Sequence, residues 1–466
     1  MLDLLLTHGR IIDPASGLDT TGAVGIRAGR ISGIYTGQVA LPAARETLDT
    51  AGRVITAGFI DLHAHADLPF LDEDYTDPRL AANTTTDRDC AERLLAQGVT
   101  TMLNGNCSFS PVDVAGYIAG CGRTAVNQRT LVGHGALRFA AGCTDKHAAA
   151  TPEHIARMCD AARAAYTSGA AGVSFGVGYT PGAAFTELLA LTQTAADAGR
   201  IAAIHTRTQG CTPAESVTEP CELALQTGAR VQISHLVYQY TGAHLRRAIE
   251  IITDYRARGA DITVDSGMYT DWATFAGSAL FEDSARAVWD WDYADMTAFG
   301  GIHDGKQMTR RLFIEARREP KTVFIVRVGN PDDIRAAYEL AECVPSTDVG
   351  PAALGGGHPQ GSATFPKFLR EIVADAGQFD LIEGLRRCST YPARILGLHN
   401  KGRVAAGADA DLVVLDLERL RPVADFPPAG NPVARPNGVT HVIVNGRLAI
   451  RDETRIAHVN AGHYVY

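Results

Sequence analysis

Histidine side chains close one of the apolar segments of this chain in a spacing that could bind a metal ion. His63 and His65 end the run GFIDLHAH, two residues apart. Because side chains alternate along a strand, both imidazoles would point to the same face. A single histidine in this position is more often a buried structural residue. A pair at a strand end is instead typical of a chelating site.

Further residues that can bind metal follow other apolar segments in the same way. His205 ends RIAAIH, His235 ends RVQISH and Cys107 ends VTTMLNGNC. Asp348 follows a short apolar stretch in ECVPSTD. A buried cysteine is usually inert, and an aspartate at a strand end is often only a cap. Imidazole and thiolate are nevertheless the ligands that Zn²⁺ prefers, so the set as a whole favours a zinc site.

Such a site predicts hydrolysis. Zinc lowers the pKa of a bound water molecule to about 7 and stabilises an oxyanion. We expect Asp348 to take the proton of that water and to pass it to the leaving group, as general base and then general acid. If His63 or His65 is not a ligand, it would donate a hydrogen bond to the oxyanion.

The segments that carry these residues alternate with amphipathic stretches, which predicts strands followed by helices. Seven apolar runs cover 58–65, 99–107, 130–137, 170–178, 200–207, 230–236 and 260–267. Helices are expected at 88–98, 152–169, 185–199 and 244–259. With an eighth strand near 342–350, the order predicts an α/β fold of the (β/α)₈ TIM-barrel type. His134 lies in the third run, and nothing distinguishes it from a packing residue.

Both ends of the chain show short alternating strands and turns. Neither end has enough strands to bury a core, so we expect residues 1–57 and 402–466 to pair as one small β-sandwich. The hydrolase barrel would then cover 58–401. The segment at about 268–330 is irregular and rich in Trp and Asp, and it is expected to be an insertion over the active-site mouth.

Composition excludes several other classes of protein. The 43 basic and 52 acidic residues give a formal charge of −9 without a block of one sign, which argues against nucleic-acid and membrane partners. No apolar run approaches the ~18 residues of a membrane span. The N-terminus lacks the features of a signal peptide. Nine cysteines without a CxxC pair indicate a reducing compartment. A cytoplasmic enzyme is expected, with a small-molecule amide as its partner and self-association left open.

Several motifs together resemble the amidohydrolase superfamily. They are GFIDLHAHAD, the strand-end residues described above and the closing segment GRVAAGADADLVVLD. GNCSFS is similar to the cysteine segment of the N-acyl-D-amino-acid deacylases. VSFGVGYTPG, IHTRTQG, ISH and GHPQGSATFPKFLRE also match that family in order. The resemblance covers nearly the whole chain outside 268–330 and implies zinc-dependent hydrolysis of a linear amide.

The resemblance also implies how the metal ligands are divided. Cys107, His205 and His235 would form one tight zinc site. A second, weaker site would be lined by His63, His65 and Asp348. Related enzymes with two metals commonly bridge them with a carboxylated lysine on the fourth strand, and the fourth run AAGVSFGVG contains no lysine. Cys107 takes that place, as the corresponding cysteine does in the deacylases.

The chain departs from the family where the substrate's α-carboxylate is held. The deacylases use a tyrosine, a lysine and an arginine there, and Tyr179 matches the tyrosine. Val237 stands at the lysine position, and GHPQGSATF offers Gln360 and Ser362 at the arginine position. A carboxylate buried without a cation is costly. Either another cation has taken this role, or the substrate is not an ordinary N-acyl-D-amino acid.

Further residues are candidates for substrate binding. Arg207 and Arg327 are the candidate replacement cations, although an arginine at a strand end is as often structural. His358 in the GHP segment is a candidate substrate contact or a loop cap. Tyr269 and Trp272 open the insertion and would either wall the pocket or form a core of the insertion itself.

The leading hypothesis is an amidohydrolase of the N-acyl-D-amino-acid deacylase type. A cyclic-amide hydrolase of the same superfamily is an alternative, but these enzymes generally carry the fourth-strand lysine. A deaminase needs only one metal and an aspartate, and it stays open. A non-catalytic scaffold relative is the third alternative, although such relatives lose the metal ligands that this chain retains.

Overall fold

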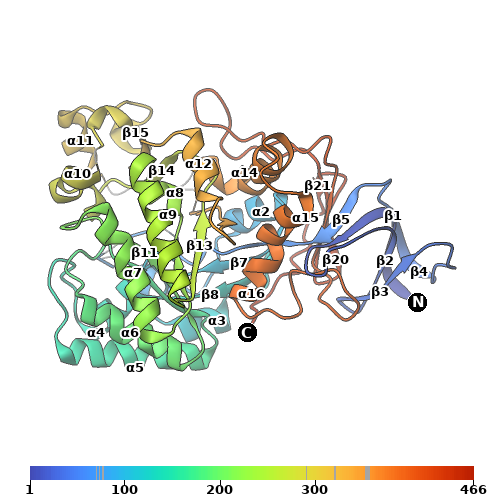
Figure 1. The fold of residues 1–466 in the computed structure, drawn as a ribbon, viewed down its shortest axis with the longest axis horizontal. Helices are drawn as coiled ribbons and strands as arrows, with labels where there is room; N and C mark the ends of the chain where they lie inside the picture. Colours follow the sequence, from blue (N-terminus) through green and yellow to red (C-terminus); the bar gives the residue numbers. More distant parts are fainter. Residues whose placement is uncertain (70, 73, 76–77, 290, 320–321, 352–356) are drawn as a thin grey trace.

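The computed structural model describes residues 1–69, 71–72, 74–75, 78–289, 291–319, 322–351 and 357–466. Two regions follow one another along the long axis of the molecule (Figure 1). One is a region of β-strands from both chain ends, and the other is a larger α/β body. Within the described residues, no helix combines the length and the apolar character needed to cross a bilayer.

Strands from both ends of the chain form one nine-stranded sheet in the order β21-β20-β19-β18-β5-β1-β2-β3, with β4 paired to β1. The antiparallel pairing of β5 with β18 joins the N-terminal and C-terminal strands, as the sequence predicted. Asn445 and Gly446, both with positive φ, make the two-residue turn between β19 and β20. The strands are β1 (Leu2–Asp13), β2 (Leu18–Arg27), β3 (Arg30–Thr36), β4 (Ala44–Asp49), β5 (Val54–Ala57), β18 (Leu412–Leu415), β19 (Val439–Val444), β20 (Arg447–Arg451) and β21 (Thr454–Arg455).

The α/β body contains two parallel sheets, which confirms the α/β class. One has the order β6-β7-β8 and the other the order β17-β13-β12-β11-β10-β9. Their strands are fully buried and short, as expected for sheets covered on both faces. They are β6 (Phe59–Asp61), β7 (Val99–Asn104), β8 (Asn127–Thr130), β9 (Val132–Gly133), β10 (Gly172–Gly176), β11 (Ile201–His205), β12 (Val231–Ile233), β13 (Ile262–Ser266) and β17 (Val344–Pro345).

Helices alternate with these strands and cover them (Figure 1). Four match the predicted positions: α2 (Arg88–Ala96), α5 (Pro152–Ser168), α6 (Phe185–Asp197) and α9 (Gly242–Ala257). Helix α7 (Pro213–Thr227) was not predicted, because Pro220 lies inside it. Shorter helices are α1 (Pro78–Ala81), α3 (Val114–Gly120), α4 (His134–Ala141), α8 (Leu236–Gln239), α10 (Asp283–Trp289), α11 (Arg310–Ala316), α12 (Pro331–Ala337), α14 (Gln360–Lys367), α15 (Leu381–Leu385) and α16 (Tyr391–Ile395).

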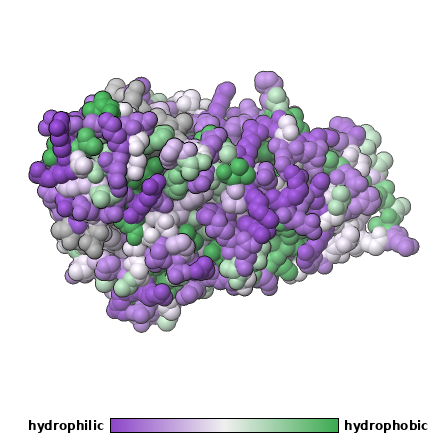
Figure 2. Space-filling model, turned by 90° about the horizontal axis from the view of Figure 1, so that it is seen from above, coloured by the Kyte–Doolittle hydropathy of each residue, from purple (hydrophilic) through white to green (hydrophobic). Residues whose placement is uncertain are grey.

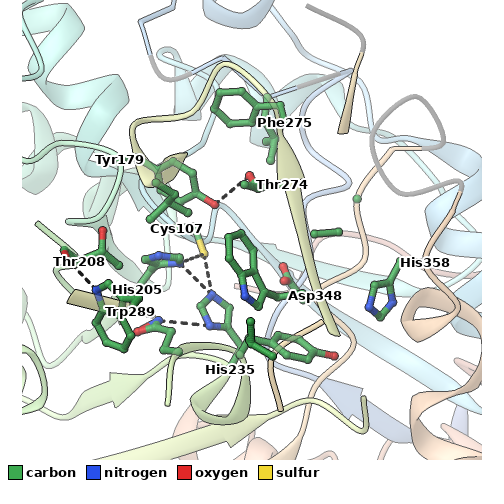
Figure 3. Close-up of a pocket in the computed structure, with 18 of the residues that line it drawn as sticks. Cys107, Tyr179, His205, Thr208, His235, Thr274, Phe275, Trp289, Asp348 and His358 are labelled. Carbon is green, nitrogen blue, oxygen red and sulfur yellow. Dashed lines mark hydrogen bonds between the residues drawn. The ribbon is translucent and has the colours of Figure 1, made fainter. Parts of the chain in front are cut away.

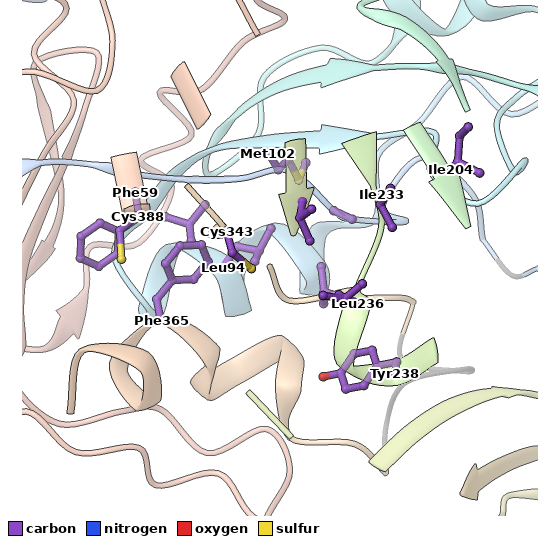
Figure 4. Packing of buried hydrophobic residues seen from close by; sticks show 14 of the residues in the cluster. Phe59, Leu94, Met102, Ile204, Ile233, Leu236, Tyr238, Cys343, Phe365 and Cys388 are labelled. Atoms are coloured by element: carbon purple, nitrogen blue, oxygen red, sulfur yellow. The ribbon is translucent and has the colours of Figure 1, made fainter. Parts of the chain in front are cut away.

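Buried side chains from strands and helices form the core of the body (Figure 4). Leu94 of α2, Met102 of β7 and Phe365 of α14 are inaccessible to solvent. Ile204 of β11 and Ile233 of β12 belong to the same cluster. The core therefore fixes the positions of the strand ends that carry the candidate ligands.

The predicted strand at 130–137 is wrong in its second half. Strand β9 ends at Gly133, and α4 begins at His134. Ala136 and Leu137 are buried on a face of this helix instead of continuing a strand. A short apolar run does not distinguish the two structures, because a buried helix turn and a buried strand are equally apolar.

The segment predicted as an insertion contains an antiparallel sheet of its own. The sheet has the order β14-β16-β15, from β14 (Asp271–Phe275), β15 (Met296–Phe299) and β16 (Val323–Arg327). Phe281, Phe313 and Phe324 pack with Trp291 in a separate cluster. This local core makes the segment a stable wall. In Figure 1 the segment, which includes α10 and α11, lies at the edge of the body away from the terminal sheet.

The surface is mainly polar on the face that Figure 2 shows. Hydrophilic residues predominate there, and hydrophobic ones occur in small scattered groups. A broad hydrophobic patch, which would mark a docking surface, is not visible on this face.

Candidate metal centre

Cys107, His205 and His235 converge at the carboxyl ends of β7, β11 and β12 (Figure 3). The Cys107 Sγ atom lies 3.4 Å from His235 Nε2 and 3.8 Å from His205 Nδ1. The two imidazole nitrogens are 3.0 Å apart. All three residues are buried.

These distances fit a tetrahedral zinc ion. With Zn–N bonds of about 2.05 Å and a Zn–S bond of about 2.3 Å, tetrahedral angles place two nitrogens about 3.3 Å apart and nitrogen and sulfur about 3.6 Å apart. The three separations between ligand atoms differ from these values by a few tenths of an ångström. The donor set and its geometry therefore suit a divalent ion of the zinc type.

The other predicted ligands join the same cluster. His63 Nε2 lies 3.2 Å from Cys107 Sγ and 3.4 Å from the Asp348 Oδ1 atom. His65 Nε2 lies 3.1 Å from Asp348 Oδ1. His63, His65 and Cys107 form a second group whose ligand atoms lie within 4.8 Å of one another. The structure thus brings together all six predicted residues, with Cys107 shared by both groups.

Three of these residues have a left-handed backbone, which is uncommon outside glycine. The φ angles are 53° at Cys107, 35° at His235 and 48° at Asp348. Such conformations cost free energy and tend to occur at functional sites. Cys107, His235 and Asp348 follow the last strand residue by two to three positions, where a sharp turn directs each side chain back to the shared centre.

The cluster holds opposite charges away from water. Burial would raise the pKa of the Cys107 thiol, but the imidazoles of His63 and His235 lower it well below its ordinary value. Burial would lower the pKa of His65, but the hydrogen bond to Asp348 raises it to about 9. Burial lowers the pKa of His205. A neutral His205 beside a thiolate is the protonation state that metal binding requires.

Sequence reasoning missed Asp265, the fourth residue of β13. Its carboxylate accepts hydrogen bonds from the His235 backbone N–H at 2.9 Å and from Gln232 Nε2 at 2.6 Å. Its Oδ1 atom also lies 3.7 Å from His63 Nδ1. Burial would raise the pKa of Asp265, but His63 lowers it below the ordinary value. The available signal was a carboxylate inside the buried run ADITVDSG.

A pocket opens over the cluster, and two of the predicted substrate residues line it. The Tyr179 hydroxyl lies 3.1 Å from Thr274 Oγ1. His358 Nε2 donates to the Asp271 carbonyl at 2.9 Å, and its Nδ1 accepts from the Gln360 N–H at 3.2 Å. Burial lowers the pKa of His358 to about 4, so this ring is neutral.

The candidate cations are not placed in the pocket. Arg207 forms an ion pair with Glu219 at 2.8 Å and donates to the carbonyls of Pro181 and Ala183, so its guanidinium is fully engaged elsewhere. Arg327 pairs with Asp271 at 3.0 Å, and its side chain is 53% exposed. Neither arginine is among the residues that line the pocket in the described part of the chain.

The insertion forms one wall of this pocket. Its contribution is largely aromatic and comes from both the sheet and α10. The insertion residues that line the pocket include Trp272, Phe275, Trp289 and Trp291. Tyr269 is buried beside His358 at a ring distance of 5.3 Å, outside the pocket lining.

Known proteins are similar to this chain in fold and over most of its length. An amidohydrolase family model matches residues 343–449. The N-acyl-D-glutamate deacylase of Alcaligenes xylosoxydans xylosoxydans is 28% identical over 96% of this chain and 93% of the relative. The D-aminoacylase of the same organism is 29% identical over 95% of this chain and 93% of the relative.

The fold is also similar to that of a solved deacylase structure. The N-acyl-D-glutamate deacylase of Bordetella bronchiseptica, complexed with zinc and a phosphonate inhibitor, superposes with a TM-score of 0.84. The two chains are 25% identical, and the match covers 99% of each.

Proposed function

We propose that this chain, an amidohydrolase similar in sequence and fold to the N-acyl-D-amino-acid deacylases, hydrolyses a linear amide at the centre formed by Cys107, His205 and His235. The observation that carries this proposal is the convergence of one thiol and two imidazoles from three different strands. A divalent ion held by these atoms would supply Lewis-acid activation of water and of the scissile carbonyl.

Asp348 is the proposed general base and acid. Its side chain lines the pocket and is 18% exposed, so a substrate can reach it. Burial would raise the pKa of Asp348, but His63 and His65 lower it, which keeps the carboxylate ready to accept a proton. It would take the proton from the attacking water and deliver it to the leaving nitrogen.

We propose zinc as the ion at Cys107, His205 and His235. His63, His65 and Asp348 line a second, weaker site, to which Cys107 is adjacent. When this second site does not hold an ion, His65 is placed to donate to the developing oxyanion. Tyr179 is proposed as a substrate contact because its ring lies 4.9 Å from that of His205.

We also propose that the parallel strands close into an eight-stranded barrel. An isolated parallel bridge between Ala64 and Val349 supports closure between the β6 and β17 ends. Leu131 is the only residue between β8 and β9, and its N–H donates to the carbonyl of Asn104, the last residue of β7. The terminal strands would fold as a separate β-sandwich domain, and the protein would act in the cytoplasm.

Metal analysis and a substrate screen test this function together. The purified protein is expected to carry about one zinc ion per chain, as a site of three protein ligands with one position open for water requires. It is expected to release acid from linear amides. Ammonia release would instead identify a deaminase, and ring opening a cyclic-amide hydrolase. A protein with far less than one ion per chain and no hydrolytic activity would contradict the proposal and support a scaffold.

A further inference from the structure

The described lining of the pocket over the candidate metal centre offers no arginine or lysine to pair with a substrate carboxylate. His65, His205 and His235 belong to the metal centre. His358 is the fourth histidine of the lining, and its Nδ1 accepts a main-chain N–H, so the ring stays neutral.

Arginines close to the pocket are already paired with acidic groups. Arg207 pairs with Glu219, and Arg327 pairs with Asp271. Arg93 donates to the carbonyl of the pocket residue Gly350 at 2.7 Å, but it pairs with Asp89 at 2.9 Å on the other side. Each cation therefore neutralises a carboxylate of the protein itself.

Val237 and Gln360, at positions where the sequence resemblance implies cations, carry neutral side chains in this structure. Val237 is 1% exposed and packs in the core of the body. Gln360 lines the pocket, and its Nε2 donates to the main-chain oxygen of Asp348 at 2.8 Å. Gln360 thus supports the backbone of the proposed base and adds no charge.

Aromatic side chains are prominent in the pocket lining. The chain has three tryptophans, and Trp272, Trp289 and Trp291 all line this one pocket. Trp289 Nε1 donates to the Thr208 carbonyl at 2.8 Å, so the polar edge of this indole is satisfied. Figure 3 shows Trp289 and Phe275 on different sides of the ligands Cys107, His205 and His235.

We propose that the substrate is an uncharged amide that carries an aromatic group and no free carboxylate. This inference rests on the proposed amide hydrolysis and specifies its substrate class. A carboxylate bound away from the metal would lose its hydration beside Asp348 without gaining a cationic side chain from the described lining. An aromatic group would instead exchange water for contact with indole and phenyl rings.

Two substrates that differ only in the carboxylate test the proposal. N-acetyl-2-phenylethylamine and N-acetyl-D-phenylalanine are supplied to the zinc-loaded protein, and kcat/KM is measured for each. We expect the neutral amide to be preferred by on the order of 100-fold. Equal or better turnover of the acyl-D-amino acid would overturn the inference and leave amide hydrolysis in place. No turnover of either amide would overturn the proposed function itself.

Binding provides a readout that is independent of turnover. Because all three tryptophans line the pocket, their fluorescence should report ligand binding directly. The zinc-loaded Asp348→Asn protein is titrated with both amides, and the neutral one is expected to bind more tightly. Removal of the Asp348 charge favours the carboxylate, so a preference for the neutral ligand in this variant is strong support. Tighter binding of N-acetyl-D-phenylalanine would contradict the proposal.

The aromatic part of the proposal has its own variant. Phe275→Ala removes one ring of the wall and should lower kcat/KM for N-acetyl-2-phenylethylamine by about tenfold. The same variant should change kcat/KM for N-acetylethylamine little, which separates a lost ring contact from general damage. Phe139→Ala is the control, since Phe139 is 37% exposed and lies outside the pocket. An equal loss for both amides would overturn the aromatic assignment.

Discussion

Two buried histidine clusters in this molecule differ in whether their charges are already matched. His134 Nε2 lies 2.7 Å from Glu187 Oε1, and Arg138 Nη1 lies 2.7 Å from the same oxygen. The side chains of His134 and Glu187 are inaccessible to solvent. At the metal centre, His205 and His235 instead direct ring nitrogens toward each other and toward a thiol.

The difference supports a structural role for the first cluster and makes the second the candidate ligand site. The carboxylate of Glu187 is saturated by cationic and hydrogen-bond partners, so nothing is left for a ligand. Lone pairs that face one another at 3.0 Å are stabilised only by a proton or a cation between them. His134, His205 and His235 all occur at apolar runs in the sequence. The residues that each imidazole contacts, and not its position along the chain, therefore distinguish a structural histidine from a candidate metal ligand.

The largest effect is expected at the candidate metal centre, from substitution of Asp348. Asp348→Asn should lower kcat by about 10³- to 10⁴-fold, because the amide cannot accept the proton of the attacking water. Bound zinc should be retained at the tight site, as metal analysis would show. Asp160→Asn, at an exposed helix ion pair, is the matched control. Near-normal activity of Asp348→Asn would remove this residue from the mechanism.

At the structural cluster we expect a loss of stability and not of metal. Glu187→Ala should lower the free energy of unfolding by about 3–5 kcal/mol, because Arg138 stays buried without its partner. Urea denaturation measures the change, and zinc content should be unaffected. Glu250→Ala breaks an exposed pair with Arg247 and should cost at most about 1 kcal/mol. Loss of zinc from Glu187→Ala would mean that the two clusters are not independent.

The same cluster predicts a pH dependence. Burial would raise the pKa of Glu187, but His134 and Arg138 outweigh it and lower the pKa from 4.5 to about 2. Since the folded pKa is the lower one, the stabilisation is complete above pH 4.5 and is lost as the pH falls toward 2. Over that range the folded state should lose about 3 kcal/mol through this group. Metal-free Glu187→Gln should show a correspondingly shallower decline in urea midpoint than the metal-free parent.

A smaller effect, on zinc affinity, is expected from Asp265, which contacts the candidate metal ligands. Asp265→Asn should weaken zinc binding by about 10- to 100-fold, because Asp265 orients His63 and the His235 backbone. Competition with a chelator measures the affinity. Asp261→Asn is the control at the other end of the same segment, where Asp261 pairs with Arg230 at the surface. Unchanged zinc affinity in Asp265→Asn would assign this carboxylate a packing role only.

Much of the site could be predicted because metal ligands leave a local signal. His63, His65, Cys107, His205 and His235 each follow an apolar run, and parallel strands bring such positions to one edge. Asp265 was missed because a carboxylate inside a strand run has no spacing that distinguishes it. Arg207 illustrates the opposite case, since its position two residues after His205 predicted a substrate contact and Glu219 engages it instead.

The sequence by itself determined the α/β class, the pairing of the two chain ends and which side chains are candidates to bind a metal ion. These depend on residue type and on local periodicity, which neighbouring residues already express. The tertiary structure alone decided that His134 pairs with Glu187, that Cys107 is shared by two candidate ligand groups, and that three tryptophans line a pocket whose described lining includes no arginine or lysine. Each of these depends on contacts between distant segments, because charge pairing and burial are properties of three-dimensional neighbours.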